Sequence, residues 1–262
     1  MNILSVFSNR NTSCLWLTPP ECLILKRNEV HIWKNVLDLD TEIIKKFLDI
    51  LSDQETQRAS RFHFDRDRRR YIAAHGHLRL ILARYLGRNP KSLTFSTNQY
   101  GKPYLSSNQE DSTALLFNLS HSFNLSVIAL SLDLETGIDI EYMNRDIDIM
   151  EVAKSFFSKG EIEDLNSLPE NMQKYAFFRC WTRKEAYLKE KGMGLFLDLR
   201  RYGTSFLPDE PTALSSSSDF PDDIAACHVY DVPLPPSFVG ALSLRDRPSI
   251  IRHFAFSSIL SV

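Results

Sequence analysis

The stretch LSVIALSLDLETGIDIEYM (residues 125–143) decides how the middle of the chain folds. Its first part, residues 125–132, is an apolar run rich in strand-forming residues. A turn at residues 135–137 leads into GIDIE, where apolar and acidic residues alternate. Because successive side chains of a strand point to opposite faces, Asp139 and Glu141 share one face and the isoleucines share the other. The pattern predicts a hairpin whose second strand carries two neighbouring carboxylates.

Two carboxylates side by side on a strand repel each other unless a cation lies between them. A site made only of oxygen ligands favours a hard ion such as Mg²⁺, which keeps few protein ligands and takes others from water and phosphates. The alternative is an edge strand with one solvated acidic face. Taken alone, Asp139 and Glu141 fit both interpretations equally well.

Helical patterns flank this stretch and resemble one another. A Ser-x-x-Glu capping pattern, typical of a helix start, precedes a long amphipathic segment that ends at a glycine. The same order recurs about 105 residues later, which indicates an internal repeat and two similar α/β halves with a ligand cleft between them. The repeated parts are Ser52 and Glu55 with residues 68–87, and Ser158 and Glu161 with residues 174–192.

The second of these helices contains WTRKEAYLKEKGMGL (residues 181–195). Trp181, Glu185 and Lys189 are spaced four residues apart and therefore lie along one stripe of the helix. The stripe can present an acid and a base to a common ligand. The alternative is an ordinary Glu–Lys pair on a solvated helix, worth a few tenths of a kcal/mol.

Basic residues give the chain a potential for binding anions. Arginine forks suit phosphate oxygens, although some of these arginines must pair with Asp65 and Asp67. Lys102 lies in a tight Gly-Lys-Pro turn, and Ser120, His121 and Ser122 together supply donors where a loop meets a strand. A lone histidine is more often structural than functional. The arginines are Arg58, Arg61, Arg66, Arg68, Arg69 and Arg70.

Composition narrows the classes of function. The 262 residues carry a net charge of −2, which gives no reason to expect a nucleic-acid binder. The four cysteines show no zinc-binding spacing, so reduced thiols in a cytoplasmic protein are expected. Residues 1–20 lack the core of a signal peptide and are expected to form a loose extension, and no window predicts a membrane span. Nucleophile-elbow, P-loop and G-x-G-x-x-G motifs are missing from the sequence.

Taken together, the motifs resemble those of the Sfp-type 4′-phosphopantetheinyl transferases. The resemblance covers residues 29–244 and follows the order LSDQETQRASRF, FSTNQYGKPYL, FNLSHS, GIDIE, FFSKGEIEDL and WTRKEAYLKEKGMGL. It implies an α+β fold of two similar α/β subdomains related by pseudo-two-fold symmetry, with the active site in the cleft between them. The expected parts are an N-terminal subdomain at residues 21–125 and a C-terminal subdomain at residues 126–262.

The resemblance also implies a reaction, the Mg²⁺-dependent transfer of the 4′-phosphopantetheine arm from coenzyme A to a serine of an apo carrier protein. The other product is adenosine 3′,5′-bisphosphate. Fatty-acid, polyketide and peptide-synthetase carriers are all compatible partners. The enzyme is expected to work as a cytoplasmic monomer, without nucleic acid or membrane.

Each matched motif implies a role for its residues. Asp139, Glu141 and Glu185 would bind magnesium, Lys189 would contact the pyrophosphate, and Glu161 or Glu185 would deprotonate the carrier serine. The nucleotide end of coenzyme A would be bound by Arg58, Arg70, Lys102, Pro103, Ser120 and His121.

Two rival interpretations belong to other classes of protein. One is a catalytically silent relative that only binds carrier proteins, and the other is a magnesium enzyme that acts on a different nucleotide. The first is disfavoured because every matched acid and the matched lysine are present.

Overall fold

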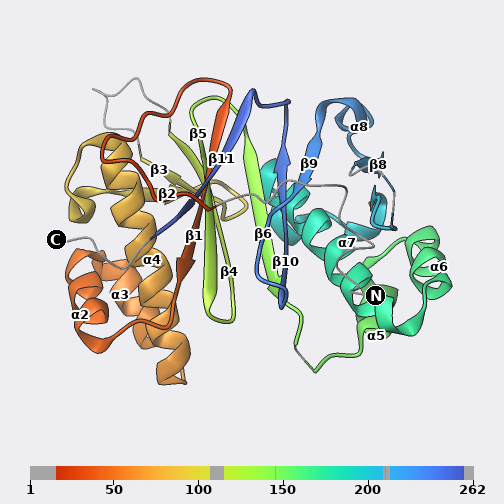
Figure 1. The fold of residues 1–262 in the computed structure, drawn as a ribbon, viewed down its shortest axis with the longest axis horizontal. Helices are drawn as coiled ribbons and strands as arrows, with labels where there is room; N and C mark the ends of the chain where they lie inside the picture. Colours follow the sequence, from red (N-terminus) through yellow and green to blue (C-terminus); the bar gives the residue numbers. More distant parts are fainter. Residues whose placement is uncertain (1–15, 107–114, 145, 209, 211–212, 257–262) are drawn as a thin grey trace.

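Two β-sheets packed face to face form the centre of the molecule, and helices cover both outer faces (Figure 1). The computed structural model describes residues 16–106, 115–144, 146–208, 210 and 213–256. The first sheet has the strand order β11-β1-β5-β4, and the second has the order β6-β10-β9. The strands are β1 (Glu29–Val36), β4 (Leu116–Ser122), β5 (Leu125–Ser131), β6 (Thr136–Tyr142), β9 (His228–Asp231), β10 (Phe238–Leu244) and β11 (Ile250–Ala255).

The helices divide into two groups, one on each sheet (Figure 1). Those of the first sheet are α2 (Thr41–Ile50), α3 (Asp53–Ser60) and α4 (Asp65–Leu86), and those of the second are α5 (Ile149–Phe156), α6 (Lys159–Ser167), α7 (Glu170–Lys191) and α8 (Asp223–Ala226). Short 3₁₀ helices are η1 (Pro90–Ser92), η2 (Gly194–Phe196) and η3 (Leu199–Arg201), and two small hairpins pair β2 (Phe95–Thr97) with β3 (Pro103–Leu105) and β7 (Tyr202–Thr204) with β8 (Leu214–Ser217). The α+β class expected from the sequence is confirmed.

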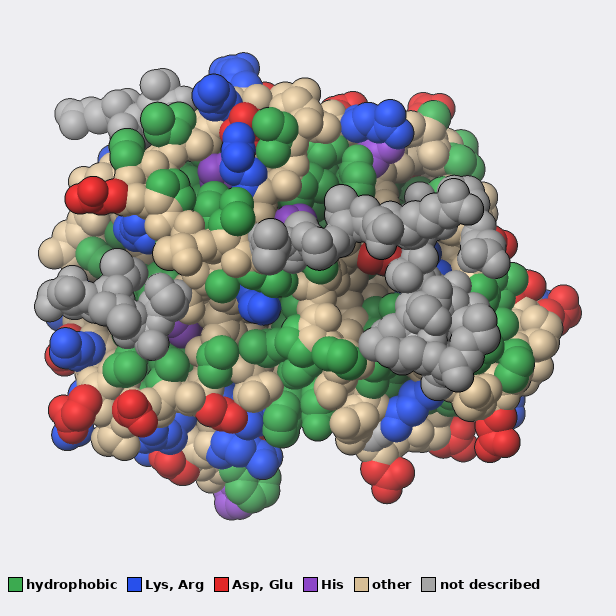
Figure 2. Space-filling view, viewed as in Figure 1, with side chains coloured by type: hydrophobic (Ala, Val, Ile, Leu, Met, Phe, Trp, Pro, Cys, Tyr) green, Lys and Arg blue, Asp and Glu red, His purple; other side chains and the backbone are tan. Residues whose placement is uncertain are grey.

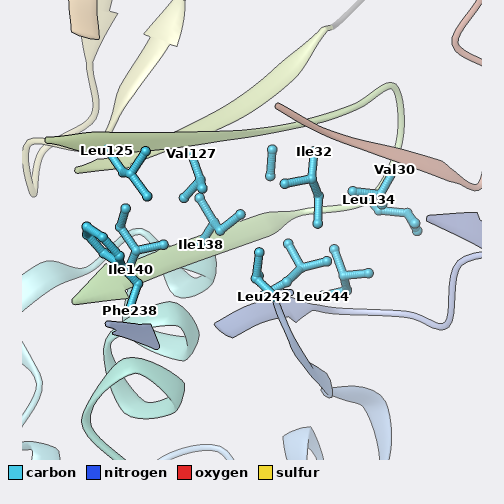
Figure 3. Close-up of a cluster of buried hydrophobic side chains, with 12 residues drawn as sticks. Val30, Ile32, Leu125, Val127, Leu134, Ile138, Ile140, Phe238, Leu242 and Leu244 are labelled. Carbon is cyan, nitrogen blue, oxygen red and sulfur yellow. The ribbon is translucent and has the colours of Figure 1, made fainter. Parts of the chain in front are cut away.

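The main core lies between the two sheets (Figure 3). Apolar side chains of β1 and β5 point toward those of β6 and β10, and the two isoleucines of GIDIE lie in this layer with exposed fractions of 0 and 1%. Burying them directs the alternate residues of β6 to the opposite face of the sheet. This packing sets the direction of Asp139 and Glu141, which point away from the core toward α7.

The predicted hairpin within residues 125–141 is wrong. Strand β5 pairs with β1 and β4, whereas β6 pairs antiparallel with β10. The connection from β5 to β6 carries the chain from one sheet to the other, so the two strands pack across the core. Face-to-face packing and a hairpin both place apolar residues at every second position, and the sequence pattern does not distinguish them.

Both predicted capping boxes form, and each extends into a buried network. Glu55 bonds to Ser52, His75 and Arg79. At the equivalent places 105 or 106 residues later, Glu161 bonds to Ser158, Cys180 and Lys184. Helices α4 and α7 also end in the same way, at Gly87 and Gly192 in the left-handed conformation with φ of 62° and 66°. These matching contacts support the internal repeat.

The Glu55 network predicts a stability that depends on pH. Burial opposes the charged form, but hydrogen bonds from His75, Arg79 and the Ser52 backbone outweigh it and lower the pKa of Glu55 from 4.5 to about 2. Because the folded pKa is the lower one, this stabilisation is present above pH 4.5 and is lost as the pH falls toward 2. Glu55→Gln should therefore lower the free energy of unfolding at pH 7 by about 2 kcal/mol after solvent screening, and by less near pH 3.

Urea denaturation of both proteins at several pH values measures this effect. Glu42→Gln is the control, because Glu42 forms an exposed pair with Lys45 on the surface of α2. The prediction fails if Glu55→Gln loses the same free energy at pH 3 as at pH 7.

The expected division at residues 125/126 falls at the start of β5, which belongs to the first sheet together with β4. Strand β11 returns from the end of the chain to pair in parallel with β1. Of the expected N-terminal extension, residues 1–15 lie outside the described residues, and Leu17 exchanges backbone hydrogen bonds with His253 and Ala255. None of the helices within the described ranges combines the length and apolarity needed to cross a membrane.

Candidate functional site

Strand β6 and helix α7 approach each other closely beside the two acidic residues. A Cβ atom added at Gly137 would lie 1.9 Å from the carbonyl oxygen of Ala186 and 2.2 Å from the amide nitrogen of Glu190. Only glycine therefore allows this packing, which brings the helix face that carries Glu185 and Lys189 onto the acidic face of β6. The glycine of GIDIE thus helps to assemble the site.

Asp139 is buried, with 5% of its surface exposed, and its carboxylate is bound from two elements. The Nζ atom of Lys189 lies 2.6 Å from Oδ1, and the hydroxyl of Ser120 donates to the same oxygen at 2.9 Å. Lys189 also donates to the Ser120 hydroxyl at 3.0 Å. Oδ2 is buried and has no hydrogen-bond partner within the described residues. One carboxylate oxygen is therefore satisfied and the other is left for a further ligand.

Glu141 and Glu185 complete the acidic group. The hydroxyl of Ser122 donates to Oε2 of Glu141 at 2.8 Å. Burial, followed by the negative charge of Asp139, raises the pKa of Glu185 to about 7; Lys189 opposes the rise and Glu141 adds to it. Three carboxylates from β6 and α7 thus lie close enough to influence one another, and they are the three that the family resemblance assigns to one site.

The chemistry of this group fits a hard divalent cation. All the candidate ligands are carboxylate oxygens, and one of them, Oδ2 of Asp139, is buried without a hydrogen-bond partner among the described residues. The pKa of Glu185 is raised by burial and, to a smaller extent, by the negative charge of Asp139, so a cation would favour its charged form. The described part of the chain nevertheless has no three His, Cys, Asp or Glu side chains in a metal-binding arrangement. Lys189 neutralises Asp139 in this structure, so a metal would share or replace that ammonium contact.

Glu161 lies in a separate network, with 5% of its surface exposed. Oε1 accepts from Lys184 at 2.8 Å and from the Thr204 amide at 3.1 Å, and Oε2 accepts from Lys184 at 2.6 Å and from the Ser158 amide at 2.8 Å. Consecutive residues of a helix point about 100° apart. Lys184 therefore binds Glu161 on a different side of α7 from the side where its neighbour Glu185 meets β6. The structure does not bring Glu161 into contact with the acidic group.

Lys102 connects the two halves of the molecule. Its Nζ atom donates to the Glu135 carboxylate at 3.1 Å and to the carbonyl oxygens of Thr136 and Glu190 at 3.3 and 3.1 Å. Lys102 and Pro103 line a cavity of about 680 Å³ beside the C-terminal end of α7. This cavity is at the Thr136 end of β6, whereas Asp139 and Glu141 lie further along the strand.

The remaining candidate residues are distributed more widely. Arg70 pairs with Asp38 through two hydrogen bonds of 2.6 and 2.9 Å, and its guanidinium lies 4.4 Å from the ring centroid of Phe123. Arg58 lines a separate surface depression, and His121 is exposed at the end of β4. Basic and acidic side chains are interspersed over the face shown in Figure 2, so the arginine-rich segment does not form one uniform basic surface in that view.

Ser122 is one of the donors expected from the sequence, but its partner was not predicted, and Lys184 had no predicted role. Ser122 binds Glu141, and Lys184 neutralises Glu161. The serines of NLSHS alternate with other residues in the strand pattern, which was a usable signal for a shared face. Lys184 has no such signal, because its role depends on the three-dimensional position of α6 against α7.

Two protein-family models match the chain. The model of the 4′-phosphopantetheinyl transferase superfamily matches residues 135–239, and the model described as 4′-phosphopantetheinyl transferase, N-terminal, matches residues 40–132. The two matches meet where the chain passes from β5 to β6, between the first sheet and the second.

Individual relatives agree with these models. The 4′-phosphopantetheinyl transferase HetI of Nostoc sp. is 39% identical over 231 residues, which cover 85% of this chain and 97% of HetI. A putative 4′-phosphopantetheinyl transferase of Synechocystis sp. is 33% identical over 183 residues, covering 70% of this chain and 71% of that protein. The 4′-phosphopantetheinyl transferase Sfp of Bacillus subtilis is 27% identical over 224 residues, covering 85% of this chain and 95% of Sfp.

Proposed function

Because the chain belongs to the Sfp-type 4′-phosphopantetheinyl transferases, we propose that it transfers the 4′-phosphopantetheine arm of coenzyme A to a serine of an apo carrier protein. The products are the holo carrier and adenosine 3′,5′-bisphosphate. The observation that carries the proposal is a group of three carboxylates and one ammonium, from Asp139, Glu141, Glu185 and Lys189. Beside them lies the buried Oδ2 atom of Asp139, which has no hydrogen-bond partner among the described residues.

The chemistry asks the protein mainly to position reactants and to neutralise developing charge. The carrier serine oxygen forms a bond to the phosphorus that bears the pantetheine arm. The bond from that phosphorus to the bridging pyrophosphate oxygen breaks, and its electrons leave with adenosine 3′,5′-bisphosphate. The serine proton passes to a base on the enzyme.

Asp139, Glu141 and Glu185 are the residues that would bind Mg²⁺. When bound, the ion withdraws negative charge from the pyrophosphate oxygens. The ammonium group of Lys189 would exchange its contact with Asp139 for one with the pyrophosphate and so stabilise the leaving group. Its present position, 2.6 Å from Asp139 Oδ1, supports that role because the exchange needs only a side-chain movement.

Glu185 is the better candidate for the base that accepts the serine proton. In the metal-free protein, burial raises the pKa of Glu185 to about 7, which makes its carboxylate a better proton acceptor than an ordinary glutamate. Both oxygens of Glu161 already accept hydrogen bonds. If Glu185 also binds the metal, one of its oxygens would do so and the other would accept the proton.

The nucleotide end of coenzyme A would extend toward the basic residues between the two halves. The candidates are Lys102 in the turn before β3, Pro103 in β3, Ser120 and His121 in β4, and Arg58 and Arg70 in helices α3 and α4. Arg70 and Lys102 would have to rearrange their present ion pairs with Asp38 and Glu135 to bind phosphate. This cost disfavours Arg70 most, because its pairing with Asp38 is bidentate.

We also propose that a single chain forms a complete site and acts as a cytoplasmic monomer. The first half supplies Ser120 and Ser122 from β4, and the second supplies the acids and Lys189 from β6 and α7. The internal repeat thus takes the place of a second subunit.

Incubation of the protein with coenzyme A, MgCl₂ and a panel of apo carrier proteins tests the proposed transfer. Intact-protein mass spectrometry should detect a phosphopantetheine adduct on at least one carrier, and EDTA should prevent it. The carrier with its serine changed to alanine is the control and should remain unmodified. Carriers that stay unmodified across a panel of fatty-acid, polyketide and peptide-synthetase types would contradict the proposal.

A further inference from the structure

The edges of the two sheets meet along β4 and β6, and side chains rather than backbone groups join them. The amide nitrogens of Ile138, Ile140 and Tyr142 point away from β10, and an unpaired strand edge of this kind must be satisfied in another way. They donate to Asn118 Oδ1 at 2.9 Å, Ser120 Oγ at 3.3 Å and Ser122 Oγ at 3.0 Å. We name these three side chains of β4 the polar ladder.

In two members of the polar ladder, Ser120 and Ser122, the hydroxyl that accepts a hydrogen bond from the β6 backbone also donates one to an acidic side chain of β6. Ser120 Oγ donates its proton to Asp139 and accepts from Ile140 N and Lys189 Nζ. A hydroxyl has one proton and two lone pairs, so these three bonds use its full capacity. Ser122 Oγ likewise donates to Glu141 at 2.8 Å while it accepts from the Tyr142 amide.

Each hydroxyl is therefore a rigid link between strand β4 of the first sheet and one carboxylate of β6 in the second sheet. A serine on a strand has a single χ1 rotation, and its oxygen is already fixed by the β6 amide. The remaining hydroxyl proton then fixes the carboxylate rotation. Groups that orient metal ligands typically change metal affinity about 10- to 100-fold when they are removed.

We propose that Ser122 is a positioning residue that orients Glu141 for Mg²⁺, through the hydroxyl that donates to that carboxylate while it accepts from the Tyr142 amide. The inference rests on the proposed metal site at Asp139, Glu141 and Glu185. Ser122 acts through Glu141 and touches neither substrate nor metal. Ser120 has the equivalent relation to Asp139, but its link to Lys189 makes its substitution harder to interpret.

Asn118 provides a matched control within the same strand. It occupies the first position of the polar ladder and accepts from Ile138 N at 2.9 Å, so its loss weakens the contact between the sheets as the loss of Ser122 does. The neighbouring β6 residue is Gly137, which has no carboxylate to orient. Asn118→Ala and Ser122→Ala therefore share the loss of one backbone acceptor and differ in the loss of a carboxylate partner.

The test measures Mg²⁺ affinity directly, by calorimetric titration of the coenzyme A complex with MgCl₂, and measures melting temperature in parallel. Ser122→Ala should weaken Mg²⁺ binding about 10- to 100-fold. Asn118→Ala should lower the melting temperature about as much as Ser122→Ala does, but keep the parent's Mg²⁺ affinity. Ser122→Thr, which retains the hydroxyl, should bind Mg²⁺ with the parent's affinity. If Ser122→Ala does not fold, Ser122→Cys offers a side chain of similar size with only a weak donor and has the same expected direction.

The outcomes separate this inference from the proposed function. Unchanged Mg²⁺ affinity in Ser122→Ala, or an equal loss in Asn118→Ala, overturns the inference, while normal transfer by the parent protein leaves the proposed function intact. A parent protein that modifies carriers without binding Mg²⁺ overturns both this inference and the metal assignment. A parent that modifies no carrier contradicts the proposed function itself.

Discussion

Asp139→Asn should lower the rate of phosphopantetheine transfer by at least about 1,000-fold, because metal stabilisation of developing charge is worth several kcal/mol and each 1.36 kcal/mol is a factor of ten in rate. The substitution preserves size and retains one oxygen for Lys189 and Ser120. It replaces the buried orphan Oδ2 with an amide NH₂, which cannot bind a cation. The variant therefore removes the free oxygen together with the negative charge that Lys189 neutralises, while the size of the side chain is kept.

The measurement is the initial rate of carrier modification at saturating coenzyme A and MgCl₂, with circular dichroism to confirm the fold. Asp198→Asn is a suitable control, because it removes an aspartate that pairs with Arg200 on the surface away from the acidic group. An Asp139→Asn protein that is folded and retains more than a tenth of the parent rate would refute the metal role of this residue.

Lys184→Met should lower the free energy of unfolding by about 3–5 kcal/mol, the usual effect of removing one partner from a buried ion pair. Lys184 is 2% exposed and its ammonium binds both oxygens of Glu161 as well as the Tyr202 carbonyl oxygen. Methionine fills a similar volume but leaves the Glu161 carboxylate buried without this cation. The loss should therefore arise from the uncompensated charge rather than from a cavity.

Urea denaturation gives the free energy of unfolding of the parent, of Lys184→Met and of the double variant Lys184→Met/Glu161→Gln. The double variant should recover part of the lost free energy of unfolding, because it removes the uncompensated negative charge of Glu161. The rate of transfer per folded molecule distinguishes a structural role of Glu161 from a role as the catalytic base. A Glu161→Gln protein with parent stability and a large loss of rate would make Glu161 the catalytic base.

The sequence predicted the local elements of this fold more successfully than their pairing. Capping boxes at Ser52 and Ser158 and glycine ends at Gly87 and Gly192 are short-range signals, and all four are confirmed. The hairpin between β5 and β6 was wrong because alternation records which face is buried and not which strand lies alongside.

The candidate site was predicted in part for the same reason. The two-residue spacing of Asp139 and Glu141 and the four-residue spacing of Glu185 and Lys189 each identify a common face, and the structure packs these faces together. Glu161 carried a motif of equal strength, yet its contacts with Lys184 and Thr204 depend on long-range packing. Spacing within one element cannot report which other element will face it.

The parallel pairing of β11 with β1 has a consequence for how the molecule can fold during synthesis. Strand β1 is translated well before residues 250–255, which form one of its two neighbours. Until the ribosome has released that segment, β1 has an open edge along which another nascent chain could pair. The first sheet is therefore complete only after the strands of the second sheet have been translated, although three of its own four strands come earlier in the chain.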